Sequence, residues 1–355
     1  MISIILGTRP EIIKMAPVIR ACQRTGTDYS VLHTGQHYSY EMDRIFFEEL
    51  ELPAPNHNLD VGSGSHAEQT GKIMTGIERI LLADRPDVVL VQGDTNTVLA
   101  GALAATKLHI PVGHVEAGLR SFDRSMPEEI NRIVADHISD FLFAPTELSR
   151  QHLLREGIDE KKISVTGNTV VDAVFENRKI AEKKNTILDD LKLIPEQYFL
   201  VTAHRAENVD VKIHLQGIID GILSIQKKYN LPVIFPMHPR TRKMMTDFGI
   251  NAKGITVIDP VGYLDFLSLE AQARLVLTDS GGLQEESCIL NVPCVTLREN
   301  TERPETIDVG ANMLAGTNAQ RIIDAASRML SVKKEWQNPY GDGKAGEKIV
   351  GICVG

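Results

Sequence analysis

The chain has 355 residues, of which 43% are hydrophobic and 24% are charged, and its formal net charge at pH 7 is -9. This length exceeds what one hydrophobic core usually serves, so it predicts about two domains. The negative charge argues against nucleic acid or an anionic membrane as the main partner. No stretch approaches the roughly 18 uninterrupted apolar residues that a membrane span requires.

The first predicted element is the apolar run Met1–Leu6, which lacks the basic start and the long apolar stretch of a signal peptide. The four cysteines, at positions 22, 288, 294 and 353, show no CxxC spacing. Buried free thiols therefore account for them better than disulfides or zinc ligands. We expect a cytoplasmic protein.

Short apolar runs alternate with helical patterns along nearly the whole chain. The strands expected before a long helical stretch at about 170–184 are Ile2–Leu6, Val31–His33, Val88–Val91, Val112–Val115, Phe141–Ala144 and Ile163–Thr166. Those expected after it are Phe199–Thr202, Val233–Phe235, Thr256–Ile258, Leu275–Thr278 and Val295–Leu297. Such alternation is typical of parallel sheets covered on both faces. The sequence predicts an α/β fold of two Rossmann-like doubly wound domains, with the polar segment 182–197 connecting them.

Three carboxylates lie where expected strands end or expected helices begin. Asp94 follows VVLVQG, Glu116 follows PVGHV, and Glu128 opens the helical stretch PEEINR. Because the carboxyl ends of parallel strands line one crevice, these side chains are expected to converge on a ligand as acid and base groups. Helix capping accounts equally well for each of them taken singly.

The loop after the first strand, Gly7-Thr8-Arg9-Pro10, is followed by Lys14. A proline suits the first positions of a helix, and a helix start binds anions through its free N–H groups. Arg9 and Lys14 are therefore predicted to point at one anion. Plain solvation of both cations is the alternative, and the loop does not contain the GxGxxG dinucleotide pattern.

A second anion loop, Thr278-Asp279-Ser280-Gly281-Gly282, joins a strand to a helix. Paired glycines let a phosphate approach the backbone, and Ser280 adds a hydroxyl donor. Glu285 or Glu286, in the following turns, is placed to accept hydrogen bonds from ribose hydroxyls, although a helix dipole also explains one acidic residue there.

Three further side chains are candidates for the same ligand. Arg303, in TERPE, precedes a proline and is predicted to close over a diphosphate with forked geometry. Without the other two loops, a solvated surface arginine would explain it equally well. His204 follows an expected strand and is a candidate acid, base or phosphate contact. Phe266 is a candidate for stacking on a base, with a place in the apolar core as the alternative. The sequence contains no Asp-x-Asp, HExxH or paired-cysteine motif, so we expect no metal.

The motifs GTRPEIIKMAP, VLVQGDT, VGHVEAGLRS, MPEEINR, TGNTVVD, TDSGGLQEE, TERPE and NPYGDG run from residue 7 to about 343. Together they resemble the non-hydrolysing UDP-N-acetylglucosamine 2-epimerases. The resemblance implies a glycosyltransferase-B-like fold, with two Rossmann-type domains facing a cleft. It implies a first domain at 1–168, joined by a C-terminal helix at about 344–355, and a UDP-binding domain at 169–343.

The family resemblance also implies roles for individual residues. The residues that match its catalytic positions are Asp94, Glu116, Glu128 and His204. The residues that match its substrate-binding positions are Arg9, Lys14, Asp94, Glu116, His204, Phe266, Ser280, Gly281, Gly282, Glu286 and Arg303. Members are typically cytoplasmic homodimers of polysaccharide biosynthesis that use neither a metal nor nicotinamide, so no cofactor is expected.

Two departures from the family pattern stand out. Val261 occupies a place where many relatives have Gln, shortly before the aromatic residue that corresponds to Phe266. The segment after Gln36-His37 is longer than in bacterial members, which hold a second, activating substrate molecule in that region. Whether a second substrate molecule activates this protein therefore does not follow from the sequence.

The activity that the resemblance implies is reversible C2 epimerisation of UDP-N-acetylglucosamine (UDP-GlcNAc) to UDP-N-acetylmannosamine (UDP-ManNAc). UDP would be eliminated to give a 2-acetamidoglucal and then added back, so the partners are both UDP-sugars and UDP. The alternatives are a 2-epimerase of a UDP-2,3-diacetamido uronic acid sugar, a hydrolysing variant, a glycosyltransferase and a non-catalytic UDP-sugar sensor. Which carboxylate acts on which face of C2 does not follow from the sequence.

Overall fold

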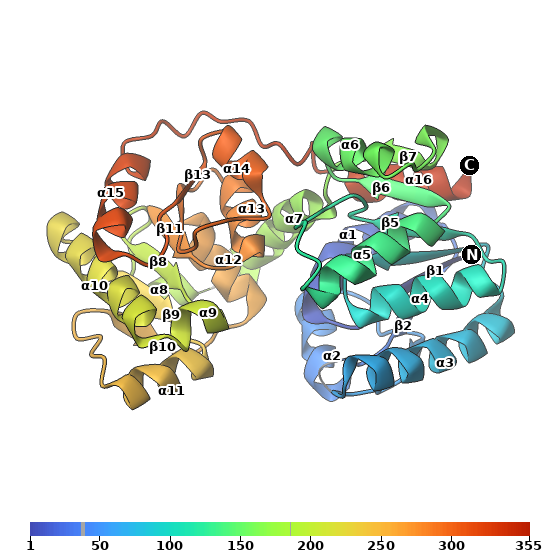
Figure 1. The fold of residues 1–355 in the computed structure, drawn as a ribbon, viewed down its shortest axis with the longest axis horizontal. Helices are drawn as coiled ribbons and strands as arrows, with labels where there is room; N and C mark the ends of the chain where they lie inside the picture. Colours follow the sequence, from blue (N-terminus) through green and yellow to red (C-terminus); the bar gives the residue numbers. More distant parts are fainter. Residues whose placement is uncertain (37–39, 185) are drawn as a thin grey trace. The chain divides into compact units, whose positions relative to one another are not determined.

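In a computed structural model, which describes residues 1–36, 40–184 and 186–355, the chain forms two compact units. The first unit comprises Met1–Glu176 with Tyr340–Gly355, and the second comprises Asn177–Pro339. Figure 1 colours them along the sequence. The segment after Gln36-His37 that is longer than in bacterial relatives begins within residues 37–39, which lie outside the described residues.

The first unit is built on a seven-stranded sheet whose pairs are all parallel, in the order β3-β2-β1-β4-β5-β6-β7. Its strands are β1 (Ile2–Leu6), β2 (Tyr29–His33), β3 (His57–Asn58), β4 (Val88–Gln92), β5 (Val112–Val115), β6 (Phe141–Ala144) and β7 (Ile163–Val165). The order reverses between β1 and β4. In doubly wound sheets, ligands bind at such a switch point, beyond the carboxyl ends of the strands.

Helices cover this sheet. They are α1 (Arg9–Thr25), α2 (Tyr40–Glu49), α3 (His66–Asp84), α4 (Asn96–Lys107), α5 (Pro127–Ile138), α6 (Glu147–Arg155), a 3-10 turn at Glu160–Lys162, the start of α7 (Thr169–Lys184), and α16 (Ala345–Val354). α3, α4 and α5 pack side by side, and α16 packs on α1 (Figure 1). At the α1–α16 contact, a side chain on Gly346 would place its Cβ 2.8 Å from the Pro17 carbonyl oxygen, so only glycine permits this approach.

The second unit repeats the topology with six parallel strands in the order β10-β9-β8-β11-β12-β13. The strands are β8 (Phe199–Thr202), β9 (Val233–Pro236), β10 (Thr256–Ile258), β11 (Leu275–Thr278), β12 (Cys294–Thr296) and β13 (Asn312–Leu314). The helices are α8 (Ile187–Asp190), α9 (Ala206–Val209), α10 (Lys212–Tyr229), α11 (Pro239–Phe248), α12 (Tyr263–Ala271), α13 (Gly281–Ile289), α14 (Pro304–Asp308) and α15 (Ala319–Met329). Its switch point lies between β8 and β11.

The prediction of two Rossmann-like doubly wound parallel sheets is confirmed. Buried aliphatic side chains of the central strands and their helices form a separate core in each unit. Every predicted strand is present to within two residues at each end, whereas β3 and β13 were not predicted. Of the helices that the structure describes, none is long and apolar enough to span a membrane.

Candidate functional site

Glu116 lies just beyond β5 and is buried, with 6% of its surface exposed. Lys14 Nζ donates to its Oε1 at 2.6 Å, Asn168 Nδ2 donates to the same oxygen at 3.0 Å, and Gln92 Nε2 donates to Oε2. Donors of this number and charge favour the ionised carboxylate. The backbone of Glu116 is left-handed, with a φ of 69°, which is a strained conformation for a residue with a side chain.

Asp94 follows β4, the strand that pairs with β5. Its carboxylate forms an ion pair with Arg132 of α5, and Asn131 Nδ2 donates to its backbone carbonyl at 2.9 Å. The Asp94 side chain keeps 31% of its surface exposed, so it remains accessible to a ligand. The cap of α4 is Thr95, whose hydroxyl accepts from the Val98 N–H at 3.4 Å. Asp94 is therefore not the capping residue.

The adjacent acidic residues at the start of α5 have different environments. Buried Glu129 accepts from the Ser121 and Phe122 N–H groups, each at 3.0 Å, and pairs with Arg132 at 2.9 Å. Although burial opposes ionisation, these donors lower the pKa of Glu129. Glu128 is half-buried, and its side chain makes no hydrogen bond or ion pair with any residue in the described part of the chain. Glu129 thus holds the Ser121–Phe122 backbone and Arg132 in place, and the Glu128 side chain remains available to a ligand.

The two cations of the first loop contact different side chains. Arg9 Nε lies 3.3 Å from Asp43 Oδ1, and its guanidinium stacks over Phe46 at 4.7 Å from the ring centroid. Asp43 is itself buried and lies 3.3 Å from His33. Lys14, in contrast, reaches Glu116. Because α2 supplies the partners of Arg9, it contributes to this site, which the sequence did not indicate.

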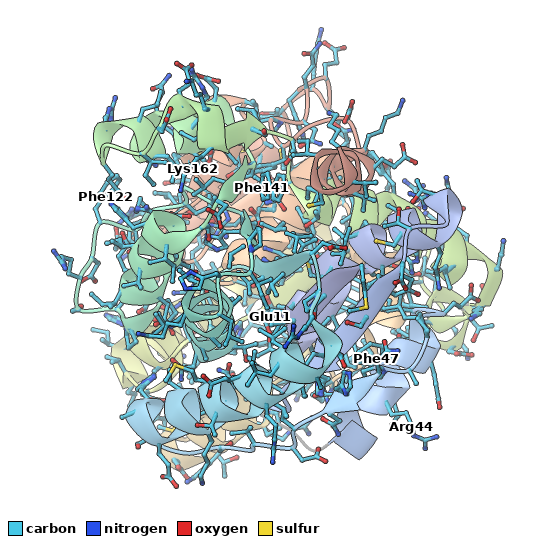
Figure 2. All side chains as sticks on the ribbon, turned by 90° about the vertical axis from the view of Figure 1, so that its right-hand side faces the viewer. Glu11, Arg44, Phe47, Phe122, Phe141 and Lys162 are labelled. Atoms are coloured by element: carbon cyan, nitrogen blue, oxygen red, sulfur yellow. The ribbon has the colours of Figure 1, made fainter. Side chains whose placement is uncertain are left out.

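Glu11 is a buried carboxyl group that joins the loops after β1 and β4. It accepts from the Gly7 N–H at 2.7 Å, from the Thr8 hydroxyl at 3.0 Å and from the Thr95 hydroxyl at 2.6 Å. Burial raises its pKa to about 7 in spite of these donors. Glu11 is buried and is labelled near the middle of Figure 2, whereas Phe122 is exposed and projects at the edge of the view. Glu11 thereby ties the loop of Arg9 to the loop of Asp94.

In the second unit, the start of α13 offers an open backbone. Ser280 is the N-cap residue, and its hydroxyl makes no capping hydrogen bond. A Cβ on Gly281 or Gly282 would meet no atom closer than 3.7 Å or 4.0 Å respectively. Free N–H groups without side-chain cover are the geometry that anion binding at a helix start requires.

The side chains around α13 divide into two pairs. Arg303 Nε lies 2.7 Å from Glu285 Oε1, and both side chains are largely buried. The Tyr263 hydroxyl lies 3.4 Å from Glu286 Oε1. Glu285 therefore anchors Arg303, whereas Glu286 is only half-buried and contacts Tyr263.

His204 follows β8 and is anchored to Asp279. Its Nδ1 lies 3.1 Å from Asp279 Oδ1, and its backbone N–H donates to the same carboxylate. Burial opposes ionisation of Asp279, but the hydrogen bond from His204 lowers its pKa. Phe266 is half-buried against an apolar cluster that contains Tyr198 and Leu269. Within the described ranges, no group of three or more His, Cys, Asp or Glu side chains is arranged to hold a metal ion.

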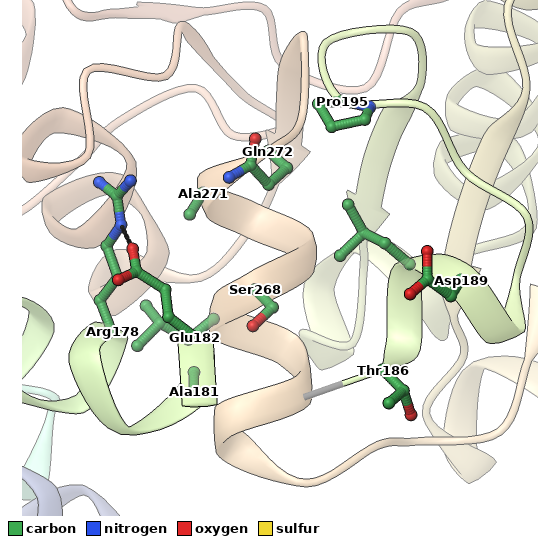
Figure 3. A pocket seen from close by; sticks show the side chains of 11 residues that line it. Arg178, Ala181, Glu182, Thr186, Asp189, Pro195, Ser268, Ala271 and Gln272 are labelled. Carbon is green, nitrogen blue, oxygen red and sulfur yellow. Dashed lines mark hydrogen bonds and ion pairs between the residues drawn. The ribbon is translucent and has the colours of Figure 1, made fainter. Parts of the chain in front are cut away.

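A separate hollow in the second unit has a volume of about 190 Å³. Figure 3 shows its lining from α7, α8 and α12, with Arg178 and Glu182 paired at 2.9 Å. None of the predicted site residues lines it.

Sequence reasoning missed the partners Gln92, Asn168, Arg132 and Asp43. Asn168 lies in the motif TGNTVVD and Arg132 in the motif MPEEINR. The motifs therefore include these two residues, but the sequence does not show which carboxylates they contact. In each unit, polar residues gather beyond the carboxyl ends of the strands beside the switch point. The fold and these sites define a Rossmann-type α/β protein whose second unit offers an open helix start that suits an anionic ligand.

The model of one family, UDP-N-acetylglucosamine 2-epimerase, matches residues 20–353. The chain belongs to this family of isomerases, as its motifs predicted. It is 59% identical to a Methanocaldococcus jannaschii protein named UDP-N-acetylglucosamine 2-epimerase, over 99% of this chain and 98% of that protein. It is 42% identical to a Pseudomonas aeruginosa UDP-2,3-diacetamido-2,3-dideoxy-D-glucuronate 2-epimerase, over 97% of each.

A solved structure of the M. jannaschii UDP-GlcNAc 2-epimerase, in complex with UDP-GlcNAc and UDP, aligns with a TM-score of 0.89 over 99% of both chains. Its sequence identity to this chain is 59%.

Proposed function

We propose that this protein interconverts UDP-GlcNAc and UDP-ManNAc by inverting C2 of the sugar, without a metal or nicotinamide. The observation that carries the proposal is the pair of carboxylates, Asp94 and Glu116, at the ends of the neighbouring strands β4 and β5. Family membership supports the substrate, since the relative of 59% identity carries that name. We also propose a cytoplasmic homodimer, as the family resemblance implies.

The chemistry requires several positioned groups. C2 of the sugar carries an amide nitrogen and has no adjacent carbonyl, so its proton is not acidic enough for simple removal and return. Eliminating UDP across C1–C2 avoids a free carbanion and gives a 2-acetamidoglucal. UDP then returns to C1 while a proton enters C2 from the opposite face. Each positioned acid or base contributes about 10²–10⁴-fold in rate.

The first unit is proposed to supply the proton-transfer groups. Asp94, Glu116 and Glu128 would exchange the C2 proton with solvent. Lys14 and Asn168 donate to Glu116 and would orient its carboxyl group toward the sugar. Arg132 likewise orients Asp94.

The second unit is proposed to hold UDP. The open start of α13, with Ser280, Gly281 and Gly282, would take the diphosphate, and Arg303 would add a forked cation. Glu286 would accept from the ribose, and Phe266 would stack on the base. His204 and, from the first unit, Arg9 would stabilise the departing diphosphate, an electrostatic contribution of the kind that dominates many enzymes.

The experiment is direct observation of the sugar by NMR after incubation with UDP-GlcNAc. Formation of UDP-ManNAc in the presence of chelator is the expected result. The relative of 42% identity makes the UDP-2,3-diacetamido uronic sugar the second substrate to test, because inversion at C2 is the same reaction. Turnover of that sugar alone would replace the proposed substrate. Binding of UDP-GlcNAc without any product would favour a sensor, and free ManNAc would indicate the hydrolysing reaction.

A further inference from the structure

His114 is a fully buried histidine in the middle of the motif that carries Glu116. Its ring Nδ1 lies 2.7 Å from Asp136 Oδ1, and its ring Nε2 lies 2.8 Å from the Gly93 carbonyl oxygen. A carboxylate and a backbone carbonyl are both acceptors, whereas a neutral imidazole has only one N–H to donate. Asp136 is also paired with Arg120, and although burial opposes its ionisation, His114 and Arg120 lower its pKa. With Asp136 ionised, both hydrogen bonds form together only when the ring carries two protons.

The charges around His114 support the imidazolium. Asp136, on α5, is fully buried, and it also accepts from the Gly118 N–H at 3.2 Å and from Arg120 Nη2 at 2.7 Å. Arg120 in turn forks onto Glu156 at 2.7 and 2.6 Å. Two cations thus balance two carboxylates in this cluster. Burial and Arg120 disfavour the charged ring, but Asp136 outweighs them and raises the pKa of His114.

The Gly93 carbonyl belongs to the peptide group that links Gly93 to Asp94. Gly93 has a φ of 86°, and its own N–H donates to Val115 at 3.1 Å. Glu116, two residues after His114, is also left-handed. The His114 ring therefore links β5, which leads into Glu116, to the carbonyl group that precedes Asp94, and it holds the Asp94 peptide against β5.

We propose that His114 is a positioning residue for this reaction: a buried imidazolium, held by Asp136, that fixes the peptide before Asp94 and so sets the spacing of Asp94 and Glu116. This inference rests on the proposed function for its kinetic consequence, but not for the protonation state. Because the His114 ring is fully buried and both of its nitrogens hydrogen-bond to protein groups, it acts through the carboxylates.

The protonation state is tested by NMR on protein with ring ¹⁵N-labelled histidine, with His114→Gln assigning the signal. At pH 8, where a histidine of ordinary pKa, about 6.5, is neutral, His114 is expected to show two protonated ring nitrogens. One unprotonated ring nitrogen at that pH would overturn the proposal. This readout stands whether or not the protein turns over UDP-GlcNAc, so it separates failure of this inference from failure of the proposed function.

The positioning role is tested by the kinetics of His114→Gln and Asp136→Asn. Displacing a catalytic group by about 1 Å lowers the reaction rate by up to about 10²-fold. We therefore expect kcat to fall 10- to 100-fold, while KM and the affinity for UDP change less than twofold. The matched control is His57→Gln, since His57 Nε2 pairs with Asp84 at 2.7 Å elsewhere in the same unit. The control should keep full kcat.

A kcat within twofold of wild type in folded His114→Gln or Asp136→Asn would refute positioning, as would a KM change that accounts for the whole loss. Asp136→Asn retains the shape of the side chain and serves if His114→Gln does not fold. In that case, the kcat and KM of Asp136→Asn alone decide whether His114 has a positioning role.

Discussion

Glu11 should make the free energy of unfolding fall as the pH rises from about 4.5 to about 7. Burial raises its pKa in the folded protein to about 7 from an ordinary value of 4.5. Below pH 4.5 the carboxyl is protonated in both states, so it costs nothing. Between pH 4.5 and 7 the unfolded chain loses the proton first, which favours unfolding. At about 1.4 kcal/mol per pH unit, the full cost above pH 7 is about 3 kcal/mol.

Glu11→Gln removes this titration and keeps a side chain of the same shape. The amide oxygen can keep accepting from the Gly7 N–H and the Thr8 hydroxyl, and the Thr95 hydroxyl can reverse its hydrogen bond to accept from the new NH2 group. We expect the variant to gain about 3 kcal/mol relative to wild type between pH 4.5 and pH 8, measured by chemical denaturation at each pH. Glu68→Gln, at a fully exposed carboxylate paired with Lys72, is the control and should not reproduce that gain. A difference between wild type and Glu11→Gln that stays constant with pH would refute the reasoning.

Three further outcomes are expected. Gly118→Ala should destabilise the protein by about 3 kcal/mol, because the φ of Gly118 is 81° and the new Cβ would lie 2.3 Å from the Ser149 carbonyl oxygen. The control Gly157→Ala should cost only about 1 kcal/mol, because Gly157 has a similar φ of 84° but open space around it. Equal losses of stability for the two variants in thermal unfolding would argue against the clash. Asp172→Asn should speed hydrogen exchange at the start of α16, where Asp172 accepts from the Ala345 and Gly346 N–H groups at 3.2 and 2.9 Å, and unchanged protection there would count against this cap. Arg303→Ala and Glu286→Ala should each weaken UDP binding about tenfold by calorimetry; unchanged affinity in both would remove α13 as the UDP site.

The strands of both sheets could be predicted because buried parallel strands need continuous apolar runs. Val88–Val91 and Leu275–Thr278 are such runs, and both became central strands. The edge strands β3 and β13 could not be predicted. His57–Asn58 and Asn312–Leu314 are short and partly polar, and only pairing with a neighbouring strand defines them.

The candidate site was predictable where position along a strand decides it. Asp94 and Glu116 follow the strands β4 and β5, so parallel pairing alone brings their loops to one edge. The partners were not predictable, since Asn168 reaches Glu116 across 52 residues of sequence. The different roles of Glu128 and Glu129 could not be predicted either, because only the direction of each side chain in the structure shows that Glu129 holds the Ser121 loop.

The central claim is that carboxylates of the first unit exchange the C2 proton with solvent. Incubation of the wild-type protein with UDP-GlcNAc in D₂O, followed by NMR of the sugar, tests it most directly. We predict UDP-ManNAc with deuterium at C2, and no label or product with Asp94→Asn or Glu116→Gln under conditions where both variants still bind UDP. UDP-ManNAc that retains its original proton at C2 would contradict the account.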